Sequence, residues 1–180
     1  MGSATISTGK GKMIHSFKGK TPKLDPTVFS VGSAEIIGDV EIARDSSVWY
    51  NAVIRGDVNY VRIGERTNIQ DGCLLHVRHL KYPLIIGADV TMGHGAIAHG
   101  CVIHDTCLIG MGAIILDNAI INSYTLVAAG AVVRNDAEFP SGVLLAGVPA
   151  KVVRDLTEAE RILIEQSALN YVEYVKSYRE

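Results

Sequence analysis

The sequence has few aromatic residues and no excess charge of either sign, and both shortages exclude classes of protein. Aromatic residues make up 6% of the 180 positions, with three Phe and one Trp, although 48% of the chain is hydrophobic. The apolar residues are therefore mostly small or aliphatic, which predicts a narrow core. A formal net charge of -2 gives no electrostatic basis for binding nucleic acid. With 20% charged residues, the composition is also that of a folded chain.

Cysteine pairs and long apolar runs are lacking as well. Cys73, Cys101 and Cys107 form no CxxC motif, so neither a disulfide framework nor a thiolate zinc cluster is predicted. We expect three reduced, buried thiols. No run approaches the ~20 apolar residues of a membrane span, and the N-terminus lacks the apolar core of a signal peptide. We therefore expect no membrane contact and a cytoplasmic location.

Aliphatic residues that recur every six positions dominate what is present. Small or β-branched residues mostly follow them four positions later, as at Ala52, Cys73 and Ala96. Neither a helical nor a simple strand period explains this pattern, whereas a hexapeptide β-helix does. Three hexapeptides then form one triangular coil around a thin core. The predicted core positions are Ile36, Ile42, Val48, Ile54, Ile63, Ile69, Leu75, Ile86, Met92, Ala98, Ile103, Ile109, Ile115, Ile121, Val127 and Val133.

Three segments are predicted along the chain. Residues 1–12 are rich in Gly, Ser, Thr and Lys, and we expect a disordered or artificial leader there. Residues 13–140 form the parallel β-helix domain. In the C-terminal segment, 141–180, Thr157 and Glu160 read as a capping box that opens a helix over about 157–178. Its apolar stripe predicts packing on the β-helix or on a neighbouring subunit.

Three of the histidines lie beside core positions on adjacent coils. His76 and His99 directly follow core residues, and His94 lies two positions after one, so their side chains are expected to point outward. Three neutral imidazoles and one water make a catalytic zinc arrangement. No single face of the prism brings all three to one point. We therefore expect a metal site that is completed across a subunit boundary.

A second polar cluster lies just upstream of these histidines. Arg55 and Asp57 are two residues apart in VIRGDV and share a strand face, which favours an ion pair that is either solvated or at an interface. Asn68, Gln70 and Asp71 follow in RTNIQDG. An alternative interpretation is that the Gln70 amide orients a metal-bound hydroxide while Asp71 and Arg55 pair behind it.

The segments VIRGDV, TNIQDGCLLH, MGHGAIAHG, IGMGAIILD and GVPAKVVR resemble the gamma-class carbonic anhydrase family and its carbonic-anhydrase-like relatives. The histidine set with NIQDG is specific, whereas GVPAKVVR is also typical of hexapeptide acyltransferases. The resemblance covers nearly the whole chain from Met13. It implies a mainly β fold, a left-handed parallel β-helix with a C-terminal α-helix, assembled as a homotrimer with metal sites at the subunit interfaces.

The resemblance also implies a ligand set and a metal. His76 and His99 are then ligands from one subunit, and His94 is the ligand from its neighbour. Zinc is the default ion, and iron or cobalt also suits three histidines.

Roles for the polar cluster follow from the same resemblance. Gln70 is expected to contact the metal-bound hydroxide, and Asn68 to position carbon dioxide or bicarbonate. Arg55, Asp57 and Asp71 are expected to tie the interface together beside the site.

One departure from the family pattern concerns proton export. The loop after the first histidine reads VRHLKYPL and has no carboxylate, and Val58 follows Asp57 where an acidic residue fits the pattern. Hydration of carbon dioxide releases a proton that must leave the site, so we expect weak turnover. His79 and Tyr171 are the candidates for the missing proton shuttle.

The sequence therefore predicts reversible hydration of carbon dioxide to bicarbonate. One enzymatic alternative is a metal-dependent acyl-CoA thioesterase, in which the same metal-bound hydroxide attacks a thioester carbonyl. The other is a hexapeptide acyltransferase, for which the chain lacks a long inserted loop. The non-enzymatic alternative is a trimeric metal-binding scaffold.

Overall fold

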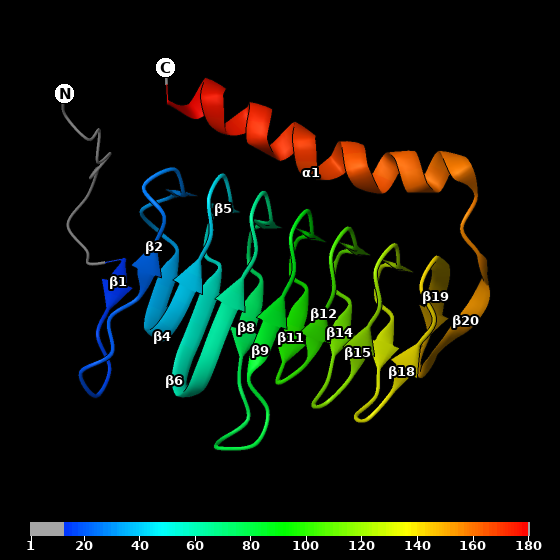
Figure 1. Ribbon diagram of the computed structural model, residues 1–180, viewed down its shortest axis with the longest axis horizontal. Helices are drawn as coiled ribbons and strands as arrows, with labels where there is room; N and C mark the ends of the chain where they lie inside the picture. Colours follow the sequence, from blue (N-terminus) through cyan, green and yellow to red (C-terminus); the bar gives the residue numbers. More distant parts are fainter. Residues whose placement is uncertain (1–12, 180) are drawn as a thin grey trace.

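Short strands coil repeatedly around one narrow prism, and a single helix lies along it (Figure 1). The computed structural model describes residues 13–179. The strands are β1 Ile14–His15, β2 Lys23–Leu24, β3 Phe29–Ser30, β4 Glu35–Ile42, β5 Ser47–Val48, β6 Val53–Ile63, β7 Asn68–Ile69, β8 Leu74–His76, β9 Leu84–Ile86, β10 Thr91–Met92, β11 Ile97–His99, β12 Val102–Ile103, β13 Leu108–Ile109, β14 Ile114–Ile115, β15 Ile120–Ile121, β16 Leu126–Val127, β17 Val132–Val133, β18 Glu138–Phe139, β19 Val143–Gly147 and β20 Ala150–Asp155.

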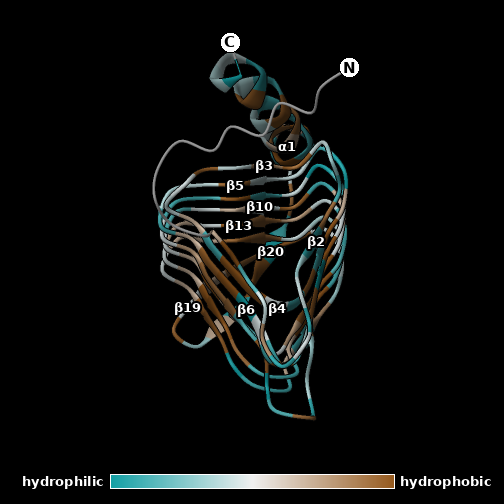
Figure 2. Ribbon diagram, turned by 90° about the vertical axis from the view of Figure 1, so that its left-hand side faces the viewer, coloured by the Kyte–Doolittle hydropathy of each residue, from teal (hydrophilic) through white to brown (hydrophobic). Residues whose placement is uncertain are grey.

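The strands make three walls, which are seen end-on in Figure 2. One sheet, β3-β5-β7-β10-β13-β16-β19-β20, lies under the helix, and we call it the helix wall. The other sheet bends along the long strands β4 and β6 into two walls. We call the wall through β8, β11, β14 and β17 the bare wall, and the wall through β9, β12, β15 and β18 the third wall.

The core follows the six-residue pattern of the sequence. All sixteen predicted core positions are buried, and the most exposed of them, Ile63, is 4% accessible. The strands stack in parallel register, with Ile109 opposite Val127 and Ile115 opposite Val133, so that one coil equals three hexapeptides. The predicted mainly β fold, a parallel β-helix with a C-terminal helix, is confirmed.

Helix α1, Glu158–Tyr178, runs back along the helix wall toward the first coils (Figure 1). The predicted capping box is formed, because Thr157 accepts from the Glu160 backbone while the Glu160 side chain accepts from the Thr157 backbone. Ile164, Ala168 and Val175 are its buried residues. Since α1 contacts β5 and β10, the helix shields the outer surface of the helix wall.

The sheet does not end at residue 140, the expected end of the β-helix domain. β19 still pairs in parallel with β16, and β20 pairs with β19 in antiparallel register. The expected leader, residues 1–12, lies outside the described residues.

The three cysteines are free and buried. Burial raises the pKa of each thiol to about 12, so all three are protonated at neutral pH. Among residues 13–179, no helix has the length and apolar character needed to cross a membrane.

Candidate functional site

Two of the predicted histidine ligands meet on neighbouring strands of the bare wall. His76 ends β8 and His99 ends β11, and the two residues are paired in parallel register. Their facing ring nitrogens, Nδ1 of His76 and Nε2 of His99, are 3.1 Å apart. Both rings lie where the bare wall turns toward the third wall, so the hexapeptide register itself stacks them.

A carboxylate holds the outer nitrogen of each ring. His76 Nε2 lies 3.0 Å from Asp57 of β6, and His99 Nδ1 lies 2.5 Å from Asp117, which follows β14. The residues Asp57, His76, His99 and Asp117 thus form one line over consecutive coils, which we call the histidine column.

An arginine closes each end of the histidine column. Arg55 donates to Asp57 at 2.5 Å and Arg78 donates to Asp117 at 2.8 Å. Burial on its own raises the pKa of a carboxyl group, but the hydrogen bonds from the arginine and the histidine outweigh it and hold the pKa of both Asp57 and Asp117 below the ordinary value. Both carboxylates are therefore charged and able to accept from the imidazoles.

The column fits a cation between its two rings. A neutral imidazole has one N–H, and that N–H is directed to the carboxylate on the outer side. Burial is the largest influence on His76 and lowers its pKa, which favours the neutral ring. With both outer nitrogens donating to the carboxylates, two nitrogen lone pairs face each other across 3.1 Å, and a carboxylate on the outer nitrogen is the usual partner of a metal-binding histidine.

The third predicted ligand, His94, lies at the opposite edge of the bare wall. It is in the corner between β10 and β11, where its Nδ1 is 2.7 Å from Asp71 and its side chain is 50% exposed. Among residues 13–179, no three histidine, cysteine or carboxylate side chains converge on a point that could hold a metal ion. Within one chain, two of the predicted ligands are therefore clustered and the third is separate.

The amide residues lie beside His94 at this corner. Gln70 is 6% exposed, and its Nε2 donates to Asn68 Oδ1 at 3.1 Å. Asn68 is fully buried and donates to Thr91 at 2.9 Å. We call Gln70, Asp71 and His94 the amide corner. Asp71 pairs with His94 there, so the expected pairing of Asp71 with Arg55 is not formed within the chain.

The two proton-shuttle candidates lie in different surroundings. His79 is exposed in the turn between β8 and β9. Tyr171 lies on α1 and lines a hollow whose other residues are Trp49, Tyr50, Asp71, Tyr174 and Tyr178. Burial first, and then the charge of Asp71, raise the pKa of Tyr171, so its phenol stays protonated at neutral pH.

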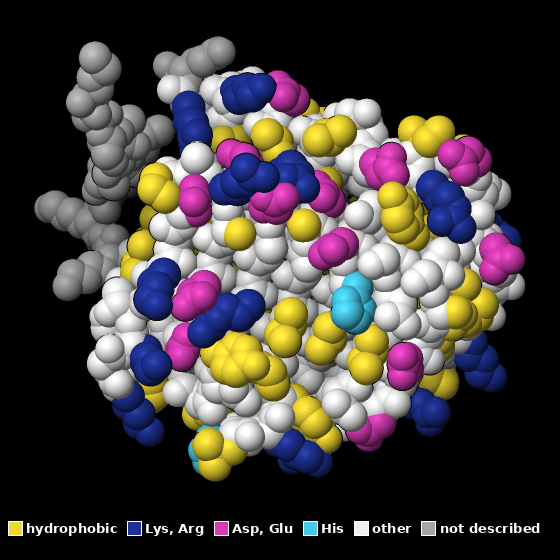
Figure 3. All heavy atoms as spheres, viewed as in Figure 1, with side chains coloured by type: hydrophobic (Ala, Val, Ile, Leu, Met, Phe, Trp, Pro, Cys, Tyr) yellow, Lys and Arg dark blue, Asp and Glu magenta, His cyan; other side chains and the backbone are white. Residues whose placement is uncertain are grey.

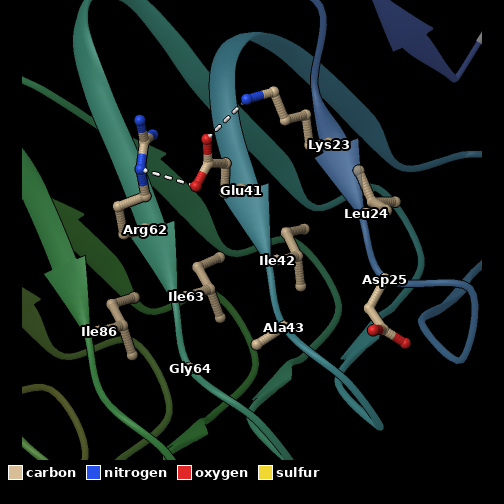
Figure 4. A pocket seen from close by; sticks show the side chains of 10 residues that line it. All are labelled: Lys23, Leu24, Asp25, Glu41, Ile42, Ala43, Arg62, Ile63, Gly64 and Ile86. Atoms are coloured by element: carbon tan, nitrogen blue, oxygen red, sulfur yellow. Dashed lines mark hydrogen bonds and ion pairs between the residues drawn. The ribbon is translucent and has the colours of Figure 1, made fainter.

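A second hollow lies away from the histidines, on the third wall (Figure 4). Ion pairs from Glu41 to Lys23, at 3.2 Å, and to Arg62, at 3.3 Å, lie along it. The charged groups that line it are held in these ion pairs or, for Asp25, in hydrogen bonds from Thr27, so this hollow is not the candidate site.

Sequence reasoning missed Asp117 and Arg78. Asp117 follows His99 by 18 residues, which is one full coil of three hexapeptides. The contact between Asp117 and His99 could therefore have been predicted from the coil length, because residues one coil apart stack on each other. Arg78 gives no such signal, because it reaches Asp117 across 39 residues from an irregular loop.

Known proteins resemble this chain over most of its length. Residues 100–135 match the family model "Bacterial transferase hexapeptide (six repeats)". The "Probable carbonic anhydrase" of Methanocaldococcus jannaschii is 50% identical over 81% of this chain and 93% of its own length. "Gamma carbonic anhydrase 2, mitochondrial" of Arabidopsis thaliana is 45% identical over 85% of this chain. The chain belongs to the gamma carbonic anhydrase family.

This gamma carbonic anhydrase family member spans 57% of the length of the Arabidopsis relative. A solved Bacillus cereus structure described as a putative acetyltransferase is 44% identical, has a TM-score of 0.90, and covers 92% of this chain and 96% of its own. The family membership and the hexapeptide fold thus agree, whereas the activities named for these relatives differ.

Proposed function

We propose that this chain is a metal-dependent carbonic anhydrase, which converts carbon dioxide and water reversibly to bicarbonate and a proton. The observation that carries the proposal is the histidine column. Its two facing imidazole nitrogens are 3.1 Å apart, while Asp57 and Asp117 hold the outer nitrogens.

In this proposal, His76 and His99 of one subunit and His94 of a neighbour hold the metal ion, with zinc as the default and iron or cobalt as alternatives. When bound, such an ion acts as a Lewis acid and lowers the pKa of a coordinated water to about 7. Asp57 and Asp117 fix the ring orientations, and their arginine partners keep both carboxylates charged.

The amide corner orients the reactants. Gln70 donates through Nε2 to Asn68, which leaves its Oε1 to accept a hydrogen bond from the attacking water. Asn68 is fully buried and uses both ends of its amide within the chain. Its role in this proposal is therefore to hold Gln70, whereas the family resemblance implied that it positions carbon dioxide or bicarbonate.

The bare wall supports assembly into a homotrimer. Its outward-facing residues form an apolar ladder in strand register, and α1 covers a different wall. Leu74 on this ladder is 46% exposed. An uncovered apolar surface of this kind favours contact with a second copy of the chain. The face drawn in Figure 3, by contrast, has acidic and basic side chains interspersed with apolar ones. The ladder is Val53, Leu74, Ile97, Ile114 and Val132.

Proton export is the weak point of the proposed reaction. Tyr171 stays protonated at neutral pH because its pKa is raised, so it accepts no proton from the site. His79 lies in the exposed turn next to Arg78, a residue that contacts the histidine column. We assign proton export to His79, and we expect turnover to depend on buffer concentration.

The test combines elemental analysis, solution mass and stopped-flow hydration of carbon dioxide on the same preparation. We expect one metal ion per chain, a trimer, and hydration faster than in buffer. His76→Ala should lose both metal and activity. His104→Ala is the matched control, because His104 is exposed on the third wall and should behave as wild type. Metal-loaded protein with no hydration above buffer would contradict the proposal and favour the scaffold.

An assay with acetyl-CoA tests whether the substrate is a thioester instead of carbon dioxide. The similar Bacillus cereus structure is described as a putative acetyltransferase, and the proposed nucleophile is also able to attack a thioester. Thiol release from acetyl-CoA that is lost in His76→Ala, without any hydration of carbon dioxide, would replace the proposed substrate with a thioester.

A further inference from the structure

A chain of hydrogen bonds, buried except at its Ser167 end, joins the amide corner to helix α1. Gln70 Nε2 donates to Asn68 Oδ1 at 3.1 Å, and Asn68 Nδ2 donates to Thr91 Oγ1 at 2.9 Å. Thr91 Oγ1 lies 3.0 Å from Ser167 Oγ, on a helix 76 residues further along the chain. Four side chains from two strands, one corner and the helix thus form one continuous path.

Water does not compete for the middle of this path. Asn68 is 0% exposed and Thr91 is 3% exposed, because α1 covers the helix wall above them. A buried amide or hydroxyl depends on its neighbours for every hydrogen bond. The partners of Asn68 and Thr91 therefore decide which way each group points.

Either hydroxyl is able to donate between Thr91 and Ser167, and the direction of the whole path depends on which one does. Thr91 Oγ1 accepts from Asn68, so its own proton needs a different acceptor, and Ser167 Oγ is within reach. With that acceptor removed, the Thr91 proton can turn back to Asn68. Asn68 then has to offer its oxygen to Thr91 and its NH2 group to Gln70. Gln70 in turn has to rotate, so that its NH2 group and not its Oε1 faces outward.

We propose that Thr91 and Ser167 are positioning residues that fix the amide of Gln70 so that Oε1 faces the reactants. The proposal rests on the proposed function for its kinetic consequence. Through Ser167, helix α1 then influences the site although it contacts neither metal nor substrate. Within the described residues, Gln70 Oε1 accepts no hydrogen bond, which is the state that this direction requires.

The experiment compares serine-to-alanine changes on the same helix. Ser167→Ala removes the acceptor at the end of the path, and Ser177→Ala removes an exposed hydroxyl near the helix C-terminus. We expect kcat of Ser167→Ala to fall about tenfold, the lower end of the loss for an outer-shell partner. KM, metal content and trimer mass should not change. Ser167→Thr, which keeps a hydroxyl, should retain the wild-type kcat, and so should Ser177→Ala.

A second readout does not depend on activity. The side-chain amide resonances of Gln70, identified by their loss in Gln70→Glu, should shift in Ser167→Ala and stay in place in Ser177→Ala and Ser167→Thr. Unchanged resonances and unchanged kcat in folded Ser167→Ala would overturn the proposal. Should the wild type show no hydration while the resonances still shift, the proposed function fails and the positioning role stands.

Thr91→Val tests the middle of the path. It removes the acceptor for the fully buried Asn68 amide, so it is expected to lower kcat at least as much as Ser167→Ala. Thr91→Ser keeps the acceptor and should restore activity. Equal losses in Thr91→Ser and Thr91→Val would assign Thr91 a packing role and contradict the proposal.

Discussion

The two edges of the bare wall carry different halves of the candidate site. At one edge, the histidine column is complete within a chain, since each imidazole has a carboxylate and each carboxylate has an arginine. At the other edge, the His94 side chain is half exposed and, among residues 13–179, its ring pairs with Asp71 alone. The column is organised within one chain, whereas in the proposed trimer the amide corner is completed by a second chain.

The orientation of the side chains keeps His94 apart from the other two histidines. β11, Ile97–His99, separates the edges by about 10 Å of backbone at the usual rise per residue, and the ring of His94 faces Asp71 while those of His76 and His99 face each other. Among residues 13–179, no three histidine, cysteine or carboxylate side chains are placed to hold a metal ion together. The proposed ion on all three histidines therefore calls for a second chain.

The largest expected effect comes from two variants that each remove a histidine from one edge of the bare wall. His99→Ala and His94→Ala should each abolish metal binding and hydration when purified alone. Trimers refolded from an equal mixture of the two variants should regain about a quarter of wild-type activity, because most trimers are mixed and each mixed trimer holds one intact site of three. The measurement is stopped-flow hydration before and after mixing. No recovery would show that the two edges do not meet across an interface.

Charge on the bare wall is expected to have the next largest effect, through assembly. Ile97→Lys places an ammonium on the apolar ladder, and Ile120→Lys makes the same change on the outside of the third wall in a similar half-buried setting. A buried unpaired charge disrupts an interface, so Ile97→Lys should be monomeric and inactive by light scattering and hydration assay. Ile120→Lys should remain trimeric, and a monomer there would assign the interface to the wrong wall.

Much of this architecture could be predicted from the sequence, because a six-residue period specifies the wall on which each residue lies. The period placed Ile109 and Ile115 in the core, and it placed His76 and His99 outside on adjacent coils. It could not supply Arg78, since the β8–β9 loop interrupts the period. It also gave no sign that Ser167, on a helix, lies 3.0 Å from Thr91, because helix-to-sheet register depends on packing.

A smaller effect distinguishes the carboxylates at the two edges. Asp117→Asn leaves the ring of His99 without an anionic acceptor at Nδ1, and loss of such a partner typically costs about 10- to 100-fold in metal affinity or activity. Asp71→Asn at the amide corner is the matched change and should cost less, because His94 is half exposed and water is able to replace the carboxylate. Competition with a zinc chelator measures both affinities. Equal losses would mean that the edges are equally organised.

The smallest expected effect concerns the helix that covers the amide corner. Thr157→Ala removes the N-cap of α1, which should lower the free energy of unfolding by about 1 kcal/mol. Metal content should not change, because the capping hydrogen bonds of Thr157 are to Glu160 and to none of the proposed ligands. Thermal unfolding with and without a chelator separates the two effects.

Glu160, which bonds Thr157 in this capping box, makes the stability of the protein depend on pH. The hydrogen bond from Arg154, followed by those from Thr157, lowers the pKa of Glu160 to about 2, below the ordinary 4.5 that it regains on unfolding. The stabilisation is therefore complete above pH 4.5 and disappears as the pH falls toward 2. Glu160→Gln should flatten that part of the stability curve in chemical denaturation between pH 6 and pH 3. A curve as steep as that of the wild type would show that the capping box does not hold the helix over the amide corner.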